Sequence, residues 1–252
     1  MKKTIIALMA LAGVVAADSI TPITSSDFTL GSERNQGNFI TQNKDAGTLS
    51  LKGSNWTQSY AHFTLGEPLT LSAETDTISI SYNIAATNSD TLVTGAIIGS
   101  GQAIVVGHGQ YKGTPQGVQY GKTDNVSGNW YNLQGENTGG VYVAGTNVAG
   151  IFSTSAPLTL NTDIAWNADK AQFVATLSYG ANKTVMTTYD LGTTYSLEKF
   201  VFSMDGPNNQ TDTISVSGLN ITYSIAPAVP EPTTATLSLL ALAGLAARRR
   251  RK

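Results

Sequence analysis

Apolar and polar residues alternate along much of the chain, most clearly between residues 78 and 84. Every second residue there is apolar, namely Ile78, Ile80, Tyr82 and Ile84, and the residues between them are Ser or Asn. A period of two predicts a β-strand with one buried face and one face toward water. The same period over residues 171–179 predicts a second such strand, and no helical period occurs outside the two ends of the chain.

Turn residues divide these segments into short strands. The polar stretches 167–170 and 180–183 separate three of them, which predicts a three-stranded meander over residues 162–191. The Gly-Ser-Gly sequence at 99–101 predicts another turn, here between two buried strands.

The alternation changes phase at two places near the end of the body. One change lies at residues 217–218, and the other lies between Leu197 and Phe200. A change of phase within a strand predicts a β-bulge or a tight bend, because one extra residue moves every following side chain to the other face.

Many short strands with polar, Gly-rich turns predict an all-β fold, a two-sheet antiparallel β-sandwich. The opening segment, with Phe39, Leu49, Leu51 and Trp56, is predicted to form outer strands that pair with the final strand around Ile221. In strand rhythm and in the closing sequence 212–216, the body resembles a jelly roll of the concanavalin or laminin-G type.

The N-terminal end has the order of features of a signal peptide. Lys2 and Lys3 precede an apolar run over residues 5–16, and small residues at 15 and 17 suit cleavage before Asp18. We therefore expect residues 1–17 to be a signal peptide removed by signal peptidase, with a buried N-terminal helix as the alternative. The β-sandwich domain is then expected over residues 18–226.

Residues 227–252 are predicted to form a separate tail. After Pro230-Glu231-Pro232 comes an apolar stretch that would span about 22 Å as a helix, against about 30 Å of hydrocarbon in a bilayer. The cations after it favour a cytoplasmic C-terminus, so the stretch is predicted to be a short transmembrane helix with the body outside. These cations are Arg248, Arg249, Arg250, Arg251 and Lys252.

The order of motif, hydrophobic helix and arginine cluster resembles the PEP-CTERM sorting signal of Gram-negative bacteria. The resemblance implies recognition by exosortase, a membrane protease, with Pro230, Glu231 and Pro232 as the recognition residues. It also implies an exported protein of the cell envelope, the outer surface or the extracellular matrix. A plain tail anchor is the alternative, and it gives an envelope location as well.

Charge and composition narrow the function further. Of 15 Lys and Arg and 17 Asp and Glu, seven basic residues and one acidic residue lie in the two terminal segments, so the body carries about −8. An acidic body argues against a nucleic-acid partner, because phosphate contacts need clustered Lys or Arg. The chain has no cysteine, so its core must supply the stability without disulfides.

The catalytic patterns sought in the body are missing. His62 is predicted in a strand and His108 in a turn, and no zinc-ligand spacing is present. There is no Gly-x-Ser-x-Gly for a nucleophilic serine. Glu74 and Asp76 have the i, i+2 spacing that two glycosidase carboxylates could use, but they stand just before a strand, where acids are usually turn residues. The sequence therefore predicts a protein that is not an enzyme.

Two stretches are candidates for ligand binding. The loop with Asp205, Asn208 and Asp212 crowds oxygen ligands suited to calcium, as a structural ion and not a catalytic cofactor, although the same residues are ordinary turn formers. A polar, Gly-rich stretch presents aromatic rings beside amides, an arrangement that can stack on a sugar and bond its hydroxyls, with packing beneath a loop as the alternative. Its residues are Asn129, Trp130, Tyr131 and Asn132.

These features favour a non-catalytic β-sandwich protein of the cell envelope that binds or builds extracellular polysaccharide matrix. The link to polysaccharide is implied by the PEP-CTERM resemblance. A carbohydrate-active hydrolase and a purely structural surface protein remain alternatives.

Overall fold

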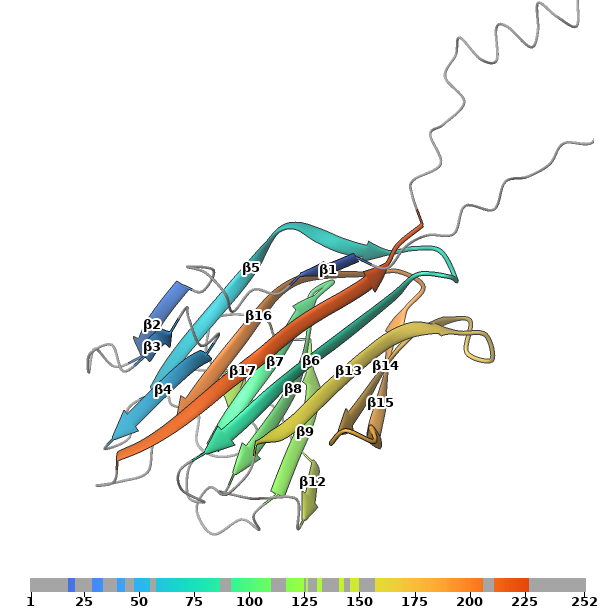
Figure 1. Cartoon of the computed structure of the whole chain (residues 1–252). Helices are drawn as coiled ribbons and strands as arrows, with labels where there is room; N and C mark the ends of the chain where they lie inside the picture. Colours follow the sequence, from blue (N-terminus) through green and yellow to red (C-terminus); the bar gives the residue numbers. More distant parts are fainter. Residues whose placement is uncertain are drawn as a thin grey trace, which may run out of the picture. The chain divides into compact units, whose positions relative to one another are not determined.

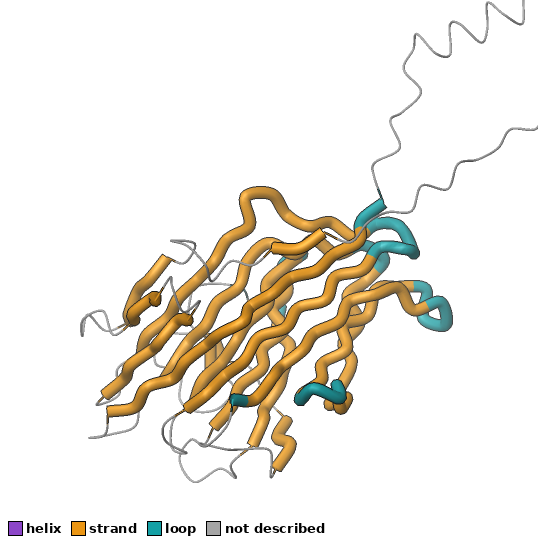
Figure 2. The backbone as a smooth tube through the Cα atoms, in the orientation of Figure 1, coloured by secondary structure: helices purple, strands orange, loops and turns teal. Residues whose placement is uncertain are grey.

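The computed structural model describes residues 18–20, 29–33, 40–43, 48–54, 58–86, 92–109, 117–124, 126, 131–132, 141–142, 146–149, 157–205 and 211–226. In Figure 2 these residues are drawn as strands and loops, and the strands belong to one compact unit, residues 16–225. None of the described residues lies in a helix with the length and hydropathy that crossing a membrane requires.

One sheet, sheet A, has antiparallel neighbours throughout and brings the first and last strands of the unit together (Figure 1). Its order is β15 (Thr184–Gly192), β14 (Gln172–Tyr179), β13 (Leu158–Asn167), β6 (Thr77–Ala86), β17 (Thr211–Ser224), β4 (Thr48–Ser54) and β3 (Ile40–Asn43), and β1 (Asp18–Ile20) also pairs with β17.

The second sheet, sheet B, is also antiparallel. Its order is β12 (Thr146–Ala149), β9 (Gly117–Thr123), β8 (Gln102–Gly109), β7 (Leu92–Gly99), β16 (Tyr195–Asp205), β5 (Gln58–Leu71) and β2 (Thr29–Glu33). A short parallel pair, β10 (Tyr131–Asn132) and β11 (Val141–Tyr142), forms a separate two-stranded sheet.

The main core lies between the two sheets and is built from their alternating residues. The predicted apolar set on β6 is buried, as are Phe173, Ala175 and Leu177 on β14. Sheet B contributes Phe200 and Phe202 of β16, and the Phe202 ring meets the Tyr82 ring edge to face at 5.2 Å. Such pairs join the sheets because an aromatic edge is attracted to an aromatic face. The two-sheet antiparallel sandwich is thus confirmed.

The predicted meander and phase changes are confirmed as well. The strands β13, β14 and β15 are sequential antiparallel neighbours. The pairing of β17 with β6 shifts register between Ser217 and Asn220, where Gly218 has a φ of +60°. The pairing of β16 shifts between Leu197 and Lys199. The 99–101 turn joins β7 to β8, with Ser100 and Gly101 at positive φ.

Three local predictions are corrected. His108 is not in a turn: it lies within β8 and pairs with Val93 and Val118 on its two sides, since hydrogen bonds from both neighbouring strands outweigh the turn preference of its flanking glycines. Ala171 precedes β14 in a turn, with a φ of +50°. Ile221 pairs with Ile20 of β1 on one side and with Ile80 of β6 on the other, and not with the strand of Leu49 and Leu51.

That strand, β4, does pair with the final strand as expected, but nearer the N-terminal end of β17 than Ile221. Leu51 lies opposite Ile214 and Leu49 lies opposite Val216. The other two residues named for this segment, Phe39 and Trp56, lie outside the described residues. Trp166 of β13 is partly buried and packs edge to face on Phe173, with 5.3 Å between the ring centroids.

Candidate functional site

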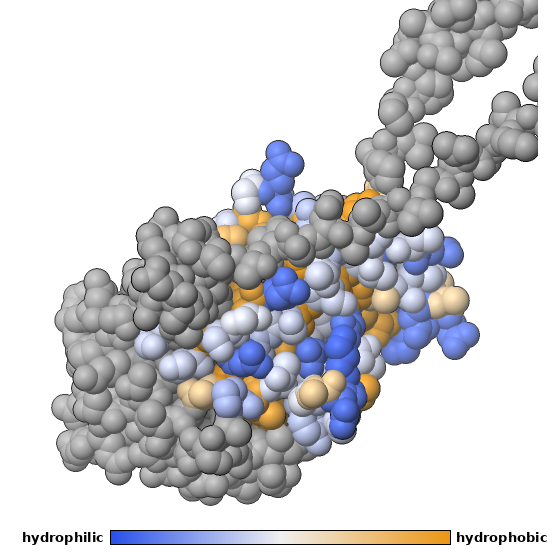
Figure 3. Space-filling view, in the orientation of Figure 1, coloured by the Kyte–Doolittle hydropathy of each residue, from blue (hydrophilic) through white to orange (hydrophobic). Residues whose placement is uncertain are grey.

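The outer face of sheet A is polar. Figure 3 shows hydrophilic and near-neutral residues over much of the described surface in its view, with narrower hydrophobic areas between them. On the two central strands β6 and β13, the residues that alternate with the core set are Ser79, Ser81, Asn83, Thr159, Asn161 and Asp163.

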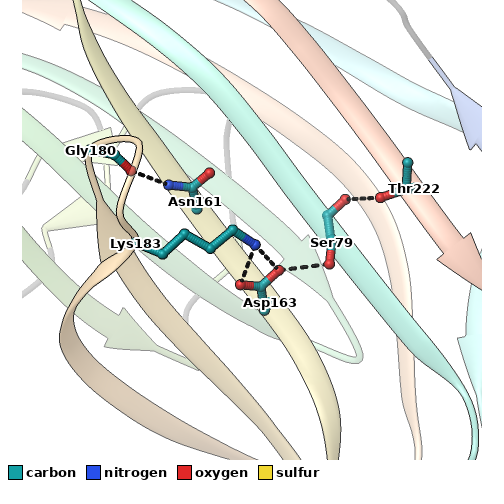
Figure 4. Close-up of polar contacts among 6 residues, drawn as sticks. All are labelled: Ser79, Asn161, Asp163, Gly180, Lys183 and Thr222. Atoms are coloured by element: carbon teal, nitrogen blue, oxygen red, sulfur yellow. Dashed lines mark hydrogen bonds and ion pairs between the residues drawn. The ribbon is translucent and has the colours of Figure 1, made fainter.

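These polar residues bond one another across strands (Figure 4). Ser79 Oγ donates to Asp163 Oδ1 at 2.6 Å, and Lys183 Nζ donates to both carboxylate oxygens of Asp163, at 3.0 and 2.8 Å. Thr222 Oγ1 donates to the backbone oxygen of Ser79 at 3.4 Å. The contacts therefore tie β17, β6 and β13 to the turn between β14 and β15.

A second pair of contacts has the same character. Asn161 Nδ2 donates to the backbone oxygen of Gly180 at 3.3 Å, and Thr159 Oγ1 donates to Asn83 Oδ1 at 2.8 Å. Because these donors and acceptors already have partners within the sheet, we interpret this face as a structural surface.

The outer face of sheet B differs, because its centre is apolar and buried. Val201, Ala96 and Val105 lie side by side on β16, β7 and β8. With two neighbours they form a second cluster, called here the outer cluster, made of Ala96, Ile98, Ala103, Val105 and Val201. Tyr60 and Val126 are partly buried and pack against it. Sheet B is therefore buried on both faces at its centre.

His62 stands beside the outer cluster on β5, directly opposite Val201. Its ring stacks on Tyr60 with 6.3 Å between centroids and 18° between planes. Burial lowers the pKa of His62 below its ordinary value of 6.5, and the positive charge of Lys199 lowers it further. The buried Nδ1 atom has no hydrogen-bond partner within the described part of the chain.

Gln119 lies on the same outer face, on β9. Its neighbours along the strand, Val118 and Tyr120, point into the main core, so Gln119 points the other way. Its side chain is 0% exposed. Neither Oε1 nor Nε2 finds a hydrogen-bond partner among the described residues. Buried amides are normally paired, so these two atoms are an exception; with no exposed surface, the side chain offers nothing to a ligand from solution.

Sequence analysis did not select Gln119, and it considered His62 only in arguing against a zinc site. Their significance depends on burial and on missing partners, which alternation does not report. The one local signal at Gln119 is a lone polar side chain between two core residues that are themselves flanked by Gly117 and Gly121.

Two of the four residues predicted to contact sugar lie among the described residues. Tyr131 and Asn132 form β10, which lies beside β7 and β16, two of the strands that carry the outer cluster. Asn129 and Trp130 lie outside the described residues. Sugar contact by this stretch stays a prediction.

Two of the three predicted calcium ligands lie among the described residues. Asp205 ends β16 in sheet B, whereas Asp212 lies in β17 of sheet A, and Asn208 lies outside the described residues. Among the residues that are described, no group of three His, Cys, Asp or Glu side chains could hold a metal ion. Calcium binding at this loop also stays a prediction.

Glu74 and Asp76 do not form a pair suited to hydrolysis. Asp76 is buried in the turn between β5 and β6, where it accepts hydrogen bonds from the backbone N–H groups of Ser72 at 2.8 Å and Ala73 at 2.7 Å. Glu74 is exposed. The turn interpretation of these acids is therefore the one that the contacts support.

Comparison with known proteins identifies the tail. The family profile of the PEP-CTERM protein-sorting motif matches residues 228–252. The chain therefore carries this sorting motif, which implies export, sorting to the cell surface and processing by exosortase. The residues named for the tail, Pro230 to Pro232 and Arg248 to Arg251, fall within the match but outside the described residues. No curated protein sequence matches the chain.

Solved structures similar to the chain include lectins. They include winged bean acidic lectin with methyl-α-D-galactose (11% identity, TM-score 0.45, covering 84% of this chain and 100% of that chain). Basic winged bean lectin with Tn-antigen has 9% identity and a TM-score of 0.48, covering 84% and 99%. The carbohydrate recognition domain of Emp47p has 11% identity and a TM-score of 0.48, covering 83% and 95%.

The two resemblances noted from the sequence, to the sorting signal and to a concanavalin-like jelly roll, are found again in these comparisons. TM-scores of 0.45 and 0.48 are too low to carry any conclusion about the ligand. The outer face of sheet B must be judged on its own residues.

Proposed function

We propose that this chain is an exported, non-catalytic β-sandwich protein that binds extracellular polysaccharide, with Trp130 and its neighbours Asn129, Tyr131 and Asn132 as the sugar contact. The observation that carries the proposal is the sorting motif at 228–252, which supports a location where matrix polysaccharide is present. Two of the proposed contact residues, Tyr131 and Asn132, form β10 beside β7 and β16.

Sugars suit such a stretch because each ring presents both C–H groups and hydroxyls. The C–H groups can pack on the rings of Trp130 and Tyr131, while the hydroxyls bond the amides of Asn129 and Asn132.

The proposal assigns no hydrolysis to Glu74 and Asp76, the two acids whose spacing suited it. Asp76 is occupied with backbone donors, and Glu74 is exposed beside it. A retaining or inverting glycosidase needs two carboxyl groups that face one scissile bond, and these two acids do not.

We also propose how the chain reaches its location. Residues 1–17 act as the signal peptide, and β1 begins at Asp18, directly after the expected cleavage point. Residues 227–252 form the sorting tail, with Pro230-Glu231-Pro232 as the sequence read by exosortase. The apolar stretch after it spans the membrane as a short helix, and Arg248 to Arg251 hold its end in the cytoplasm.

Binding can be tested with the mature protein on an array of bacterial polysaccharides. We expect retention on at least one polysaccharide, and Trp130→Ala should weaken it several-fold to about tenfold, the expected effect of losing one aromatic ring that stacks on a sugar. Ser81→Ala, on the outer face of sheet A, is the matched control and should bind as wild type does. Absence of retention on every polysaccharide would leave a purely structural surface protein as the function.

A further inference from the structure

The end of β17, the last strand of the body, is paired on both sides. On one side it pairs with β6 as far as Ser224, which lies opposite Thr77. On the other side β4 pairs with residues 211–217, and the short strand β1 pairs with residues 221–223 (Figure 1). Among the described residues, β1 is therefore the one strand that covers this side of β17 at its end.

The chain between β17 and the sorting sequence is short. Ile225, the residue after the strand, is half-buried and packs against the main core. Four residues, 226–229, then separate it from Pro230, the first residue of the sorting sequence. Even fully extended, the five steps from Ile225 to Pro230 span about 17 Å. The sequence that exosortase reads thus begins a short length of chain after the last paired backbone of the body.

Paired backbone limits what a protease can use. A protease takes its substrate as an extended segment, so backbone that is bonded within a sheet must first open. Opening the end of β17 breaks the pairs with β6 alone when β1 is detached, and the pairs on both sides when β1 is in place. The pairing of β1 therefore determines how much chain before Pro230 is available to exosortase.

We propose that β1 is a positioning element for removal of the tail, a step that rests on the proposed processing by exosortase. By pairing with residues 221–223, β1 fixes the end of β17, so exosortase works on the chain from residue 226 onward. This strand begins at Asp18, the expected first residue after signal-peptide cleavage. Signal peptidase also needs an extended segment at its cut, so the signal peptide is removed before β1 closes on β17.

The test shortens the chain before the motif, in the full-length protein and in the native host. Deletion of residues 226–228 leaves Val229 alone between Ile225 and Pro230, so exosortase has to open the end of β17. We expect removal of the tail to slow at least about tenfold, measured by pulse-chase labelling and mass spectrometry. Replacement of residues 226–228 by Gly-Ser-Gly keeps the length. It is the matched control and should be processed as wild type is.

Ile20→Pro supplies a readout that a merely structural role would not move. Proline has no N–H to pair with β17 and has a fixed φ, so this variant should weaken β1. In the shortened chain, it should restore tail removal to within about threefold of the wild-type rate. In a chain of natural length, it should leave the rate unchanged. Thr188→Pro on the edge strand β15 is the control for general weakening of the body and should restore nothing.

The proposal is overturned if the shortened chain loses its tail at the wild-type rate, or if Ile20→Pro fails to restore removal. It is also overturned if Thr188→Pro restores removal equally well. N-terminal sequencing should find Asp18 in every variant, and another first residue would contradict the order of events. These outcomes concern β1 alone. If wild-type protein itself keeps its terminal arginines, the proposed processing fails and the role of β1 fails with it.

Discussion

Two glycines of sheet B lie in opposite surroundings. A Cβ atom at Gly99 would meet the backbone oxygen of Ser196 and, at 2.8 Å, the Tyr195 ring, whereas a Cβ at Gly66 would meet nothing within 4 Å. Next to Gly99, Ser100 Oγ accepts a hydrogen bond from the Ser196 N–H at 2.8 Å. At the residue scale, Gly99 is therefore required for the close approach of the β7–β8 turn to β16.

Gly99→Ala should lower the free energy of unfolding by about 1–3 kcal/mol, the usual cost of forcing a methyl group into a packed interior. The backbone oxygen of Ser196 cannot move aside cheaply, because β16 is paired on both sides. Gly66→Ala is the matched control and should be neutral or gain up to about 0.5–1 kcal/mol. Urea unfolding of both variants measures this, and equal stabilities would contradict the close approach.

His62 should make stability depend on pH. Its folded-state pKa is lowered, mainly by burial and also by Lys199. Just below the ordinary value of 6.5, the unfolded chain takes up a proton at this residue that the folded chain does not. The unfolded state then binds more protons, so the stability due to neutral His62 is present above the ordinary pKa and is lost as the pH falls through the folded pKa.

We therefore expect wild type to lose stability more steeply than His62→Gln between about pH 7 and pH 5. Urea unfolding at a series of pH values measures the difference. Other titrating groups, His108 among them, are present in both proteins and cancel in the comparison. Parallel curves would show that His62 titrates equally in the folded and unfolded chains.

At the scale of elements, tight turns determine how consecutive strands are connected. Asp76 closes the turn between β5 and β6 with its side chain, and its own N–H donates to the Ala73 carbonyl at 2.8 Å. These bonds direct the chain from sheet B into sheet A, so the turn determines where the central strand β6 begins.

Asp76→Ala should destabilise the fold by about 2–3 kcal/mol, because the backbone donors of Ser72 and Ala73 lose a charged acceptor in a partly buried place. Glu74→Ala in the same turn is the matched control. It removes an exposed side chain and should change stability by less than about 0.5 kcal/mol. Thermal unfolding of the two variants distinguishes a specific role of the Asp76 side chain from a turn that is sensitive to any substitution. If both variants were destabilised alike, the turn would be generally sensitive.

At the scale of the whole molecule, an acidic body is joined to a cationic tail. Pro230 and Pro232 have no backbone N–H to donate and have fixed φ, which favours an extended segment that a protease can bind. Glu231 is the single charged residue between Asp212 and Arg248, so we propose it as a specificity contact for exosortase. The sorting motif matched at 228–252 includes all of these tail residues.

We expect the native host to remove the tail, and Glu231→Ala to leave the full-length form in the membrane. Mass spectrometry of the envelope fraction should find wild-type protein without Arg248 to Lys252 and the variant with them. Glu198→Ala, an exposed acid within the body, is the control and should be processed as wild type is. Mature wild-type protein that keeps its terminal arginines would identify the tail as a plain anchor.

Strand identity and local irregularities could be predicted from the sequence because they depend on neighbours in the chain. Alternation located β6 and the β13–β15 meander, and the phase changes located the shifts near Gly218 and Leu197. The tail could be predicted for a similar reason, since its motif, apolar stretch and cations are contiguous. Where the local signal was ambiguous, as for the glycine-flanked His108, pairing with distant strands determined the outcome.

The residues of the candidate site could not be predicted in this way, because their surroundings depend on segments that are distant in the sequence. The run Ala103 to Val106 indicated a buried strand, but only the tertiary structure decided that its two sides enter two different clusters, the main core and the outer cluster. Gln119 and His62 come from strands far apart in sequence, and they share a face because β8, β7 and β16 are arranged between theirs. The sequence by itself thus determined the strands and the sorting signal of this protein. Only the tertiary structure decided which side chains are buried and which polar atoms lack partners, because both depend on contacts between distant segments.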